Sequence, residues 1–234
     1  MKKEFSDYLH AVDAKKAHLD SLRPLPEELD HHLDEWTAIE LTYNSNALEG
    51  NTLSLKETAL VVEYGLTIGG KTVREHLEAI NHVHAYNFVK ECATKSRTDL
   101  SLADIFDIHR LILKAIDDKN AGRLRMVSVG IKGTNIVFPS PLQLHDLMNQ
   151  FMTWLHEAQG HPIIIAADAH YKLVSIHPFI DGNGRTSRLL MNLLLLQTGY
   201  TPAIIDVEKR KEYIDALEQY RTAQNPDAFY SLMC

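Results

Sequence analysis

Cysteine is rare in this sequence and long apolar runs are absent, and each absence excludes a class of protein. The two cysteines, Cys92 and Cys234, form neither a disulfide framework nor a paired-cysteine metal motif. No stretch reaches the ~18 consecutive apolar residues that a membrane-spanning helix needs. The opening MKKEFSDYLHAVDAKK carries early lysines without the apolar core of a signal peptide. We therefore expect a cytoplasmic protein that makes no use of a membrane.

An excess of positive charge is also missing. The chain has 24 Lys and Arg against 31 Asp and Glu, a formal net charge of −7. A nucleic-acid-binding face needs clustered basic residues to neutralise phosphates. We therefore expect no nucleic-acid partner, and any phosphate site must be local. The 45% hydrophobic content still suffices for a packed core.

Histidine is plentiful, with 13 residues, so a metal site was weighed. No HExxH motif occurs, and the neighbouring pairs lack a matching set of cysteines or carboxylates. These pairs are His31 with His32, His82 with His84, and His156 with His161. The pattern disfavours a structural zinc site.

Helical periodicity covers most of the chain and predicts an all-α fold. Residues 27–47 place Leu29, Leu33 and Trp36 at three- and four-residue steps, which predicts an amphipathic helix. Its apolar face would dock on the core or on another copy of the chain. Capping boxes predict three further helix starts, at Ser54 with Glu57, Thr72 with Glu75, and Ser101 with Asp104. Later helices are expected over about 141–158, 162–176, 185–198 and 207–222.

One segment, RMVSVGIKGTNIVFPSP at 125–141, breaks the helical rhythm. Val127, Val129 and Ile131 alternate with other residues before the turn-rich KGTN and the returning IVF. This alternation predicts a small β-hairpin. Two interpretations stay open: a surface ornament, or an exposed edge that accepts a strand from a guest peptide.

The most informative stretch is IHPFIDGNGRTSRLLM at 176–191, which interrupts two apolar helices. A glycine-rich turn before a helix N-terminus forms an anion site, because backbone N–H groups point outward and glycines let phosphate approach. Arg185 and Arg188 lie one helical turn apart and add planar donors suited to phosphate. Asp181 offers a hard oxygen ligand for Mg²⁺.

His177 precedes Pro178 at the end of the preceding helix, so its imidazole can face the same anion pocket. Its ordinary pKa makes it the natural proton acceptor near neutral pH. The alternative is a plain helical corner with a capping aspartate, a core histidine and solvated arginines. That alternative suits each residue alone, whereas the combination favours nucleotidyl or phosphoryl transfer.

HPFIDGNGRTSR resembles the signature of the Fic domain family, HPFx(D/E)GNGRxxR, at every fixed position. The resemblance extends over about residues 36–205 and is strongest to the branch that includes the animal endoplasmic-reticulum enzyme. It implies the Fic helical bundle with a small β-hairpin flap over the active site. The implied division is an N-terminal helical segment at 1–35, the Fic domain at 36–205 with its flap at about 125–138, and a C-terminal helical segment at 206–234.

The resemblance also implies transfer of AMP from ATP to a Ser, Thr or Tyr hydroxyl of a target protein. His177 would be the general base, and Asp181 would hold Mg²⁺. The backbone of Gly182, Asn183 and Gly184, with the Asn183 side chain, would cradle the α-phosphate. Arg185 would contact the β-phosphate and Arg188 the γ-phosphate. The flap residues Val129, Gly130, Ile131 and Lys132 would pair with the target backbone.

A second motif, SNALEGNT at 45–52, fits the pattern (S/T)xxxE(G/N) and resembles the inhibitory helix of Fic proteins, here at about 36–50. Taken alone it also fits an ordinary helix end. A carboxylate at Glu49 opposes the helix dipole and favours a nearby cation. The resemblance implies that Ser45, Glu49 and Gly50 form an autoinhibitory element in which Glu49 pairs with Arg188. Whether Glu49 also supports removal of AMP stays open.

Two alternative functions remain at this stage. A related transferase could use another donor and move UMP or phosphate. A binding module could sense a nucleotide and grip a peptide without turnover, although His177 argues against this. A DNA-associated regulator is disfavoured by the charge. A homodimer is a further expectation from the resemblance.

Overall fold

The computed structural model describes residues 3–130 and 136–233, and within them every regular element is a helix, with no β-strand. The family expectation of a helical bundle is therefore met. The α-helices of this described part are α1 (Lys3–Leu22), α2 (Glu27–Leu48), α3 (Leu55–Tyr64), α4 (Val73–Cys92), α5 (Leu102–Leu113), α6 (Leu144–Glu157), α7 (Pro162–Ile176), α8 (Asn183–Gln197), α9 (Arg210–Ala223) and α10 (Asp227–Ser231). Short 3₁₀ helices, η1 (Arg97–Asp99), η2 (Pro141–Gln143) and η3 (Val207–Lys209), join some of them.

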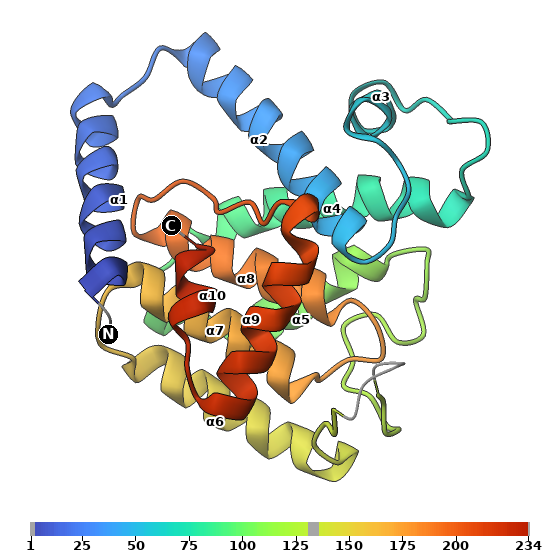
Figure 1. Cartoon of the computed structure of the whole chain (residues 1–234). Coiled ribbons are helices and arrows are strands. Elements are labelled where there is room, and N and C mark those ends of the chain that lie inside the picture. Colours follow the sequence, from blue (N-terminus) through green and yellow to red (C-terminus); the bar gives the residue numbers. More distant parts are fainter. Residues whose placement is uncertain (1–2, 131–135, 234) are drawn as a thin grey trace.

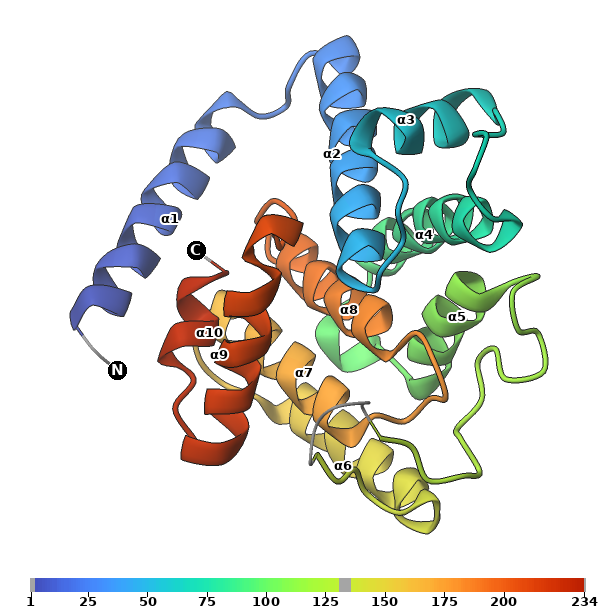
Figure 2. The ribbon, with the colours of Figure 1, turned by 45° about the vertical axis from the view of Figure 1, so that its right-hand side comes forward.

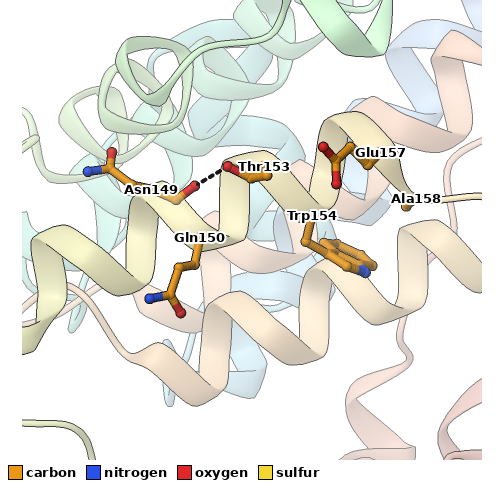
Figure 3. A pocket seen from close by; sticks show the side chains of 6 residues that line it. All are labelled: Asn149, Gln150, Thr153, Trp154, Glu157 and Ala158. Atoms are coloured by element: carbon orange, nitrogen blue, oxygen red, sulfur yellow. Dashed lines mark hydrogen bonds between the residues drawn. The ribbon is translucent and has the colours of Figure 1, made fainter.

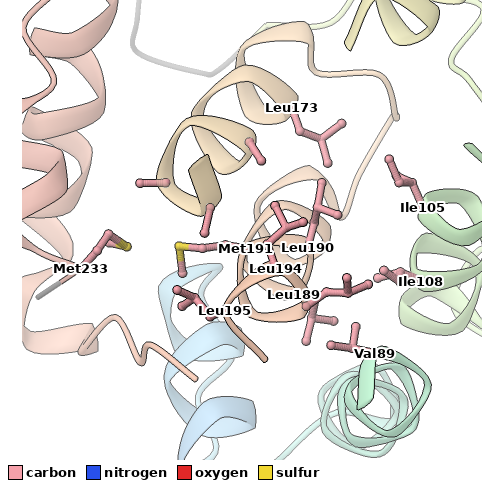
Figure 4. Close-up of a cluster of buried hydrophobic side chains, with 14 of the residues drawn as sticks. Val89, Ile105, Ile108, Leu173, Leu189, Leu190, Met191, Leu194, Leu195 and Met233 are labelled. Carbon is pink, nitrogen blue, oxygen red and sulfur yellow. The ribbon is translucent and has the colours of Figure 1, made fainter. Parts of the chain in front are cut away.

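Helix α8 lies at the centre of the bundle (Figure 1). Every residue from 185 to 195 is buried. From residue 189 on, the run LLMNLLLL presents mostly apolar side chains on all sides of the helix. Figure 4 shows Leu189, Leu190 and Leu194 of α8 among apolar side chains from α4, α5 and α7. This packing holds the N-terminus of α8 in a fixed position.

The three predicted capping boxes are confirmed. Ser54, Thr72 and Ser101 each accept a hydrogen bond from the backbone N–H three residues on, and the acidic side chain at that position bonds back. Such reciprocal bonds satisfy N–H groups that the helix itself leaves open. The box at Thr72 matters for function, because it fixes the first turns of α4, which face α8.

Helix α2 has two halves with different surroundings. In the first half Leu29, Leu33 and Trp36 are 47%, 44% and 57% exposed. In the second half even the polar side chains of Thr42, Asn44, Ser45 and Asn46 are buried. Figure 1 shows why: the first half extends beyond the bundle, whereas the C-terminal end of α2 packs near both α4 and α8. The first half contacts α4 through the ion pair between Asp34 and Lys90. The predicted helix is confirmed, but its apolar stripe docks over only part of its length.

The predicted β-hairpin is wrong for the described residues, since 125–130 and 136–138 contain no strand. Arg125 is 2% exposed, and its guanidinium donates to the carbonyls of Val127 at 2.9 Å and Pro139 at 2.7 Å. These carbonyls therefore face the arginine rather than an amide across a ladder. Residues 131–135, with the predicted flap residues Ile131 and Lys132, lie outside the described part of the chain.

The N- and C-terminal helices meet each other at one edge of the bundle. Phe5 of α1 and Tyr230 of α10 have ring centroids 5.3 Å apart, and Figure 2 shows α1 alongside α10. One apolar core cluster runs from Phe5 to Met233. The predicted division at residues 35 and 205 stays a prediction. Within the described ranges, no helix combines the length and apolar character that crossing a membrane requires.

Candidate active site

Residues 177–182 form the loop between α7 and α8, which we call the anion loop. The side chain of Asn183 holds this loop by two hydrogen bonds to the Phe179 backbone. Its Oδ1 accepts from the Phe179 N–H at 3.0 Å, and its Nδ2 donates to the Phe179 carbonyl at 2.9 Å. Gly182 precedes α8 with φ +77°, a conformation that favours glycine. The first amides of α8 have no partner within the helix, so this N-terminus suits an anion.

His177 ends α7 in a left-handed conformation, with φ +51°. Its carbonyl accepts from Arg125 Nε at 2.8 Å, and the Phe138 ring stacks on its imidazole with centroids 4.0 Å apart. Nδ1 of the ring lies 3.2 Å from the Val174 carbonyl oxygen. A carbonyl oxygen only accepts, so Nδ1 carries the proton. Burial, assisted by the Arg125 charge, holds the pKa of His177 below its ordinary value. The unprotonated Nε2 is thus available near neutral pH.

The predicted contact between Glu49 and Arg188 is present. Arg188 Nη2 donates to Glu49 Oε1 at 2.7 Å, and Arg188 also donates to the Ser45 hydroxyl at 3.0 Å and the Ser45 carbonyl at 2.8 Å. From the other side, Arg188 Nη1 donates to the Tyr213 hydroxyl at 3.4 Å. The arginine side chain is 4% exposed, so α2 and α9 together enclose it.

The Glu49 carboxylate also lies directly over the N-terminus of α8. A Cβ placed on Gly184 would overlap Glu49 Oε1, so only glycine leaves room for the carboxylate here. Burial alone would raise the pKa of Glu49, but the Arg188 charge outweighs it and lowers this pKa below the ordinary value. Glu49 is therefore an anion placed at an anion-binding helix end. Gly50 follows at φ +97° and ends α2.

Asp181 occupies the opposite side of the anion loop, with Arg74, Glu78 and Arg185. Its carboxylate accepts from Arg74 Nη2 at 2.6 Å, from the Gly182 N–H at 2.6 Å and from Arg185 Nη2 at 3.4 Å. Burial would raise the pKa of Asp181, but the nearby arginines, Arg185 foremost, lower it. Arg185 Nη1 lies 3.3 Å from Glu78, and its buried Nε has no hydrogen-bond partner in the described structure.

The residues present can hold a divalent ion only together with a substrate. No group of three or more His, Cys, Asp or Glu side chains converges in the described ranges. Asp181 is a single carboxylate whose side chain is 44% exposed. Mg²⁺ usually binds through one or two carboxylates plus substrate phosphates, so this donor set fits Mg²⁺ bound with a polyphosphate.

A pocket of about 350 Å³ joins the predicted residues of the inhibitory and catalytic sets. Its lining includes Glu49, His177, Gly184 and Arg188, with α9 forming another wall. Asp181 and Arg185 are outside this lining, and so are Val129 and Gly130. A hollow on the outer face of α6, where the Thr153 hydroxyl donates to the Asn149 carbonyl (Figure 3), contains none of the predicted site residues.

Sequence reasoning missed four side chains that support these residues: Arg74, His109, Arg125 and Tyr213. His109 is fully buried, and burial lowers its pKa to about 4, so the ring is neutral at pH 7. It follows Ile105 by four residues and therefore belongs to the buried face of its helix, which the periodicity could have shown. Arg74 and Tyr213 carry no comparable local signal.

The fold and site define a helical protein whose central helix has an N-terminus suited to an anion. Residues 99–195 match the Fic/DOC family. "Protein adenylyltransferase Fic" of Aedes aegypti is 42% identical over 183 residues, 77% of this chain and 36% of the relative. "Protein adenylyltransferase fic-1" of Caenorhabditis elegans is 38% identical over 220 residues, 88% of this chain and 42% of the relative.

Solved structures agree. A segment of Fic-1 from C. elegans has a TM-score of 0.83 at 33% identity, covering 99% of this chain and 67% of that one. A Fic domain containing signaling protein from Bacteroides thetaiotaomicron has a TM-score of 0.83 at 28% identity, covering 94% and 87%. The chain belongs to the Fic/DOC family. It spans 36% and 42% of the length of the two curated relatives named above.

Proposed function

We propose that this protein is a protein adenylyltransferase, which moves AMP from ATP to a Ser, Thr or Tyr hydroxyl of a target protein. The observation that carries the proposal is that His177 lines one pocket with Gly184 and Arg188 at the N-terminus of α8, where burial lowers the pKa of its imidazole. The names of the relatives support the same reaction. A bond forms between the target oxygen and the α-phosphorus, and the bond to pyrophosphate breaks.

Each proposed role follows from a position in the site. His177 Nε2 takes the proton of the attacking hydroxyl, since Nδ1 is engaged by the Val174 carbonyl. The amides of Gly182, Asn183 and Gly184 hold the α-phosphate at the start of α8. Arg185 contacts the β-phosphate and Arg188 the γ-phosphate. Such transfer depends mainly on positioning and on stabilising developing charge.

Asp181 is the proposed ligand of Mg²⁺. When bound with ATP, Mg²⁺ neutralises phosphate charge. Arg74 and the Gly182 N–H orient the Asp181 carboxylate in its absence. The remaining ligands would come from the phosphates and water, as the single exposed carboxylate requires.

Ser45, Glu49 and Gly50 are proposed to keep the enzyme inactive. Glu49 engages Arg188, and its carboxylate covers Gly184, so the γ-phosphate loses its arginine and the helix end is occupied by another anion. Ser45 adds two acceptors that hold Arg188 in this pose. Activation requires Glu49 to leave. Removal of AMP by the same glutamate stays a prediction.

The segment before residue 131 is proposed to contact the target protein. Met126 and Val127 are 86% and 56% exposed, so their side chains are accessible to a target segment. Val129 and Gly130 continue this segment, and the predicted contacts of Ile131 and Lys132 complete it. The target hydroxyl would then lie beside His177, because Arg125 ties this segment to the His177 carbonyl. A homodimer stays a prediction.

Self-modification measured by intact mass tests the proposal. The protein, Glu49→Gly, and Glu49→Gly with His177→Ala are incubated with Mg²⁺ and ATP. We expect AMP addition to rise in the single variant and to fall by ~10²–10⁴-fold when the base is removed. His145→Ala, an exposed histidine on α6, is the matched control and should have no effect.

The same measurement separates the alternative functions. A phosphate increment from ATP, or a UMP increment from UTP that exceeds AMP addition, would assign another transferase chemistry. ATP binding without any covalent increment in Glu49→Gly, also with added peptide targets, would contradict turnover and assign a nucleotide-sensing binding module.

A further inference from the structure

His109 of α5 lies directly beneath the anion loop and is bonded through both ring nitrogens. Nε2 is 2.9 Å from the Asp181 carbonyl, and Nδ1 is 2.9 Å from the Gly122 amide nitrogen. A carbonyl only accepts and an amide N–H only donates, so Nε2 carries the proton and Nδ1 accepts. One neutral tautomer satisfies both neighbours.

The ring also fits the loop by shape. Phe179 stacks on its face, with centroids 3.7 Å apart and planes inclined by 6°. A Cβ on Gly182 would come within 3.2 Å of His109 Cδ2, closer than ordinary contacts allow. Three residues of the anion loop, Phe179, Asp181 and Gly182, therefore rest on one buried side chain.

The hydrogen bond to Asp181 has a consequence on the far side of the peptide. The unit that joins Asp181 to Gly182 is planar, so fixing the Asp181 carbonyl also fixes the direction of the Gly182 N–H. That N–H donates to Asp181 Oδ1 at 2.6 Å. His109 thereby sets the orientation of the carboxylate from the protein interior, while the carboxylate itself remains 44% exposed.

We infer that His109 is a positioning residue that aims the Asp181 carboxylate at the metal position, through the Gly182 N–H that holds this carboxylate. This inference rests on the proposed function, since it assigns a role toward Mg²⁺ and ATP. His109 does not touch the substrate. It acts through the rigid Asp181–Gly182 peptide from beneath the loop, whereas Arg74 and Arg185 contact the carboxylate directly.

The second hydrogen bond of His109 offers a way to separate positioning from mere packing. Glutamine can place its side-chain N–H₂ near the Nε2 position and keep the bond to the Asp181 carbonyl. Asparagine can place its carbonyl near the Nδ1 position and keep only the bond from Gly122. Each variant loses the ring and one hydrogen bond, so a purely structural role predicts similar losses for both.

The test compares His109→Gln with His109→Asn in the Glu49→Gly background. Isothermal titration calorimetry gives the affinity for a non-hydrolysable ATP analogue with Mg²⁺ and with EDTA. We expect the gain in affinity due to Mg²⁺ to drop ~10-fold or more in His109→Asn and to stay within ~3-fold of the parent gain in His109→Gln. The reason is that His109→Asn misplaces one hydrogen bond to the charged Asp181 carboxylate. Equal losses, or no loss, would overturn the inference.

A measurement on the unsubstituted chain covers the case in which a variant does not fold. ¹⁵N NMR of labelled histidine at pH 7.5 should show the Nε2–H tautomer for the ring that cross-relaxes with Phe179. An Nδ1–H tautomer would contradict the geometry. The calorimetric comparison needs no turnover, so a failed mass assay with an intact difference between Gln and Asn would count against the proposed reaction alone.

Discussion

The N-terminus of α8 has a closed side and an open side. On the closed side, Arg188 is 4% exposed and receives short contacts from Ser45 and Glu49, with the Tyr213 hydroxyl behind it. On the open side, Arg185 lies 3.3 to 3.4 Å from Glu78 and Asp181, and Asp181 and Arg74 are 44% and 55% exposed.

The difference separates two kinds of control. The closed side must lose a contact between helices before Arg188 can meet a phosphate, so its opening is a conformational event. On the open side Asp181 and Arg74 already face solvent, although Arg185 is 3% exposed, so an arriving cation only exchanges partners with Arg74. A ligand shifts such an equilibrium only by its differential affinity for the two states. We therefore propose that the contact between Glu49 and Arg188 governs activity and that the open side governs metal dependence.

The largest expected effect comes from removing Arg188. In the Glu49→Gly background, Arg188→Ala should lower AMP transfer by ~10²–10³-fold, because a preorganised donor to developing charge is lost. In the parent chain, Glu49→Gly should activate transfer, whereas in Arg188→Ala it should not. A double-mutant cycle on initial rates measures this coupling.

Equal activation by Glu49→Gly in both backgrounds would show that Glu49 does not act through Arg188. In that case the contact of its carboxylate with Gly184 would be the dominant inhibitory interaction.

The open side is tested by Arg74→Gln. Exposed ion pairs contribute ~0.2–1 kcal/mol, so removing this competitor at 2.6 Å from Asp181 should lower the Mg²⁺ concentration for half-saturation by about 2- to 5-fold. The readout is the Mg²⁺ titration of a fluorescent ATP analogue bound to the protein. The control is Arg23→Gln. Arg23 directly follows α1, is similarly exposed and pairs with Asp20 of that helix. A higher Mg²⁺ requirement would mean that Arg74 assists the metal.

Tyr213→Phe probes the wall behind the closed side. The Tyr213 hydroxyl accepts from Arg188 and lies 2.9 Å from His170 Nε2, so its loss leaves buried groups without a partner. We expect a loss of ~1 kcal/mol in the free energy of unfolding and a Tm lower by about 2–4 °C for a chain of this size. Thermal unfolding checks this against Tyr64→Phe, since Tyr64 is 68% exposed. Equal Tm values for Tyr213→Phe and Tyr64→Phe would show that the Tyr213 hydroxyl does not stabilise the fold.

Local signals predicted the fold well. The boxes at Ser54, Thr72 and Ser101 depend only on residues three apart, and helix bounds agreed within a few residues. The hairpin failed because the alternation of apolar residues ignored Arg125, whose guanidinium takes the carbonyls that a ladder would need. Leu29 is 47% exposed within the chain, because periodicity defines an apolar face without saying what lies opposite it, and docking of this face on another copy stays a prediction.

Contacts across the chain were predictable only in part. Glu49 and Arg188 are 139 residues apart, and the resemblance to a family, not the spacing, paired them. Arg74 meets Asp181 across 107 residues through the packing of α4 near α8, which no local pattern records. Periodicity could have placed His109 on the buried face of α5, but its bond to Asp181 depends on how α5 lies under the loop.

The smallest expected effect concerns pH: activation of AMP transfer by Glu49→Gly should not change with pH. The folded-state pKa of Glu49 is below its ordinary 4.5, so the stabilisation from its pair with Arg188 is fully present above about pH 4.5 and is lost only as pH falls through the lower folded value. The pKa of His177 is also lowered, so its base form predominates above pH 7 in both proteins.

The ratio of AMP transfer by Glu49→Gly to that by the parent chain should therefore stay constant from pH 7 to 9. Initial rates at fixed ionic strength measure it. A ratio that falls toward one as pH drops to 7 would mean that the Glu49 carboxylate takes up a proton in that range, and the closed side would then be released by protonation rather than by movement of α2.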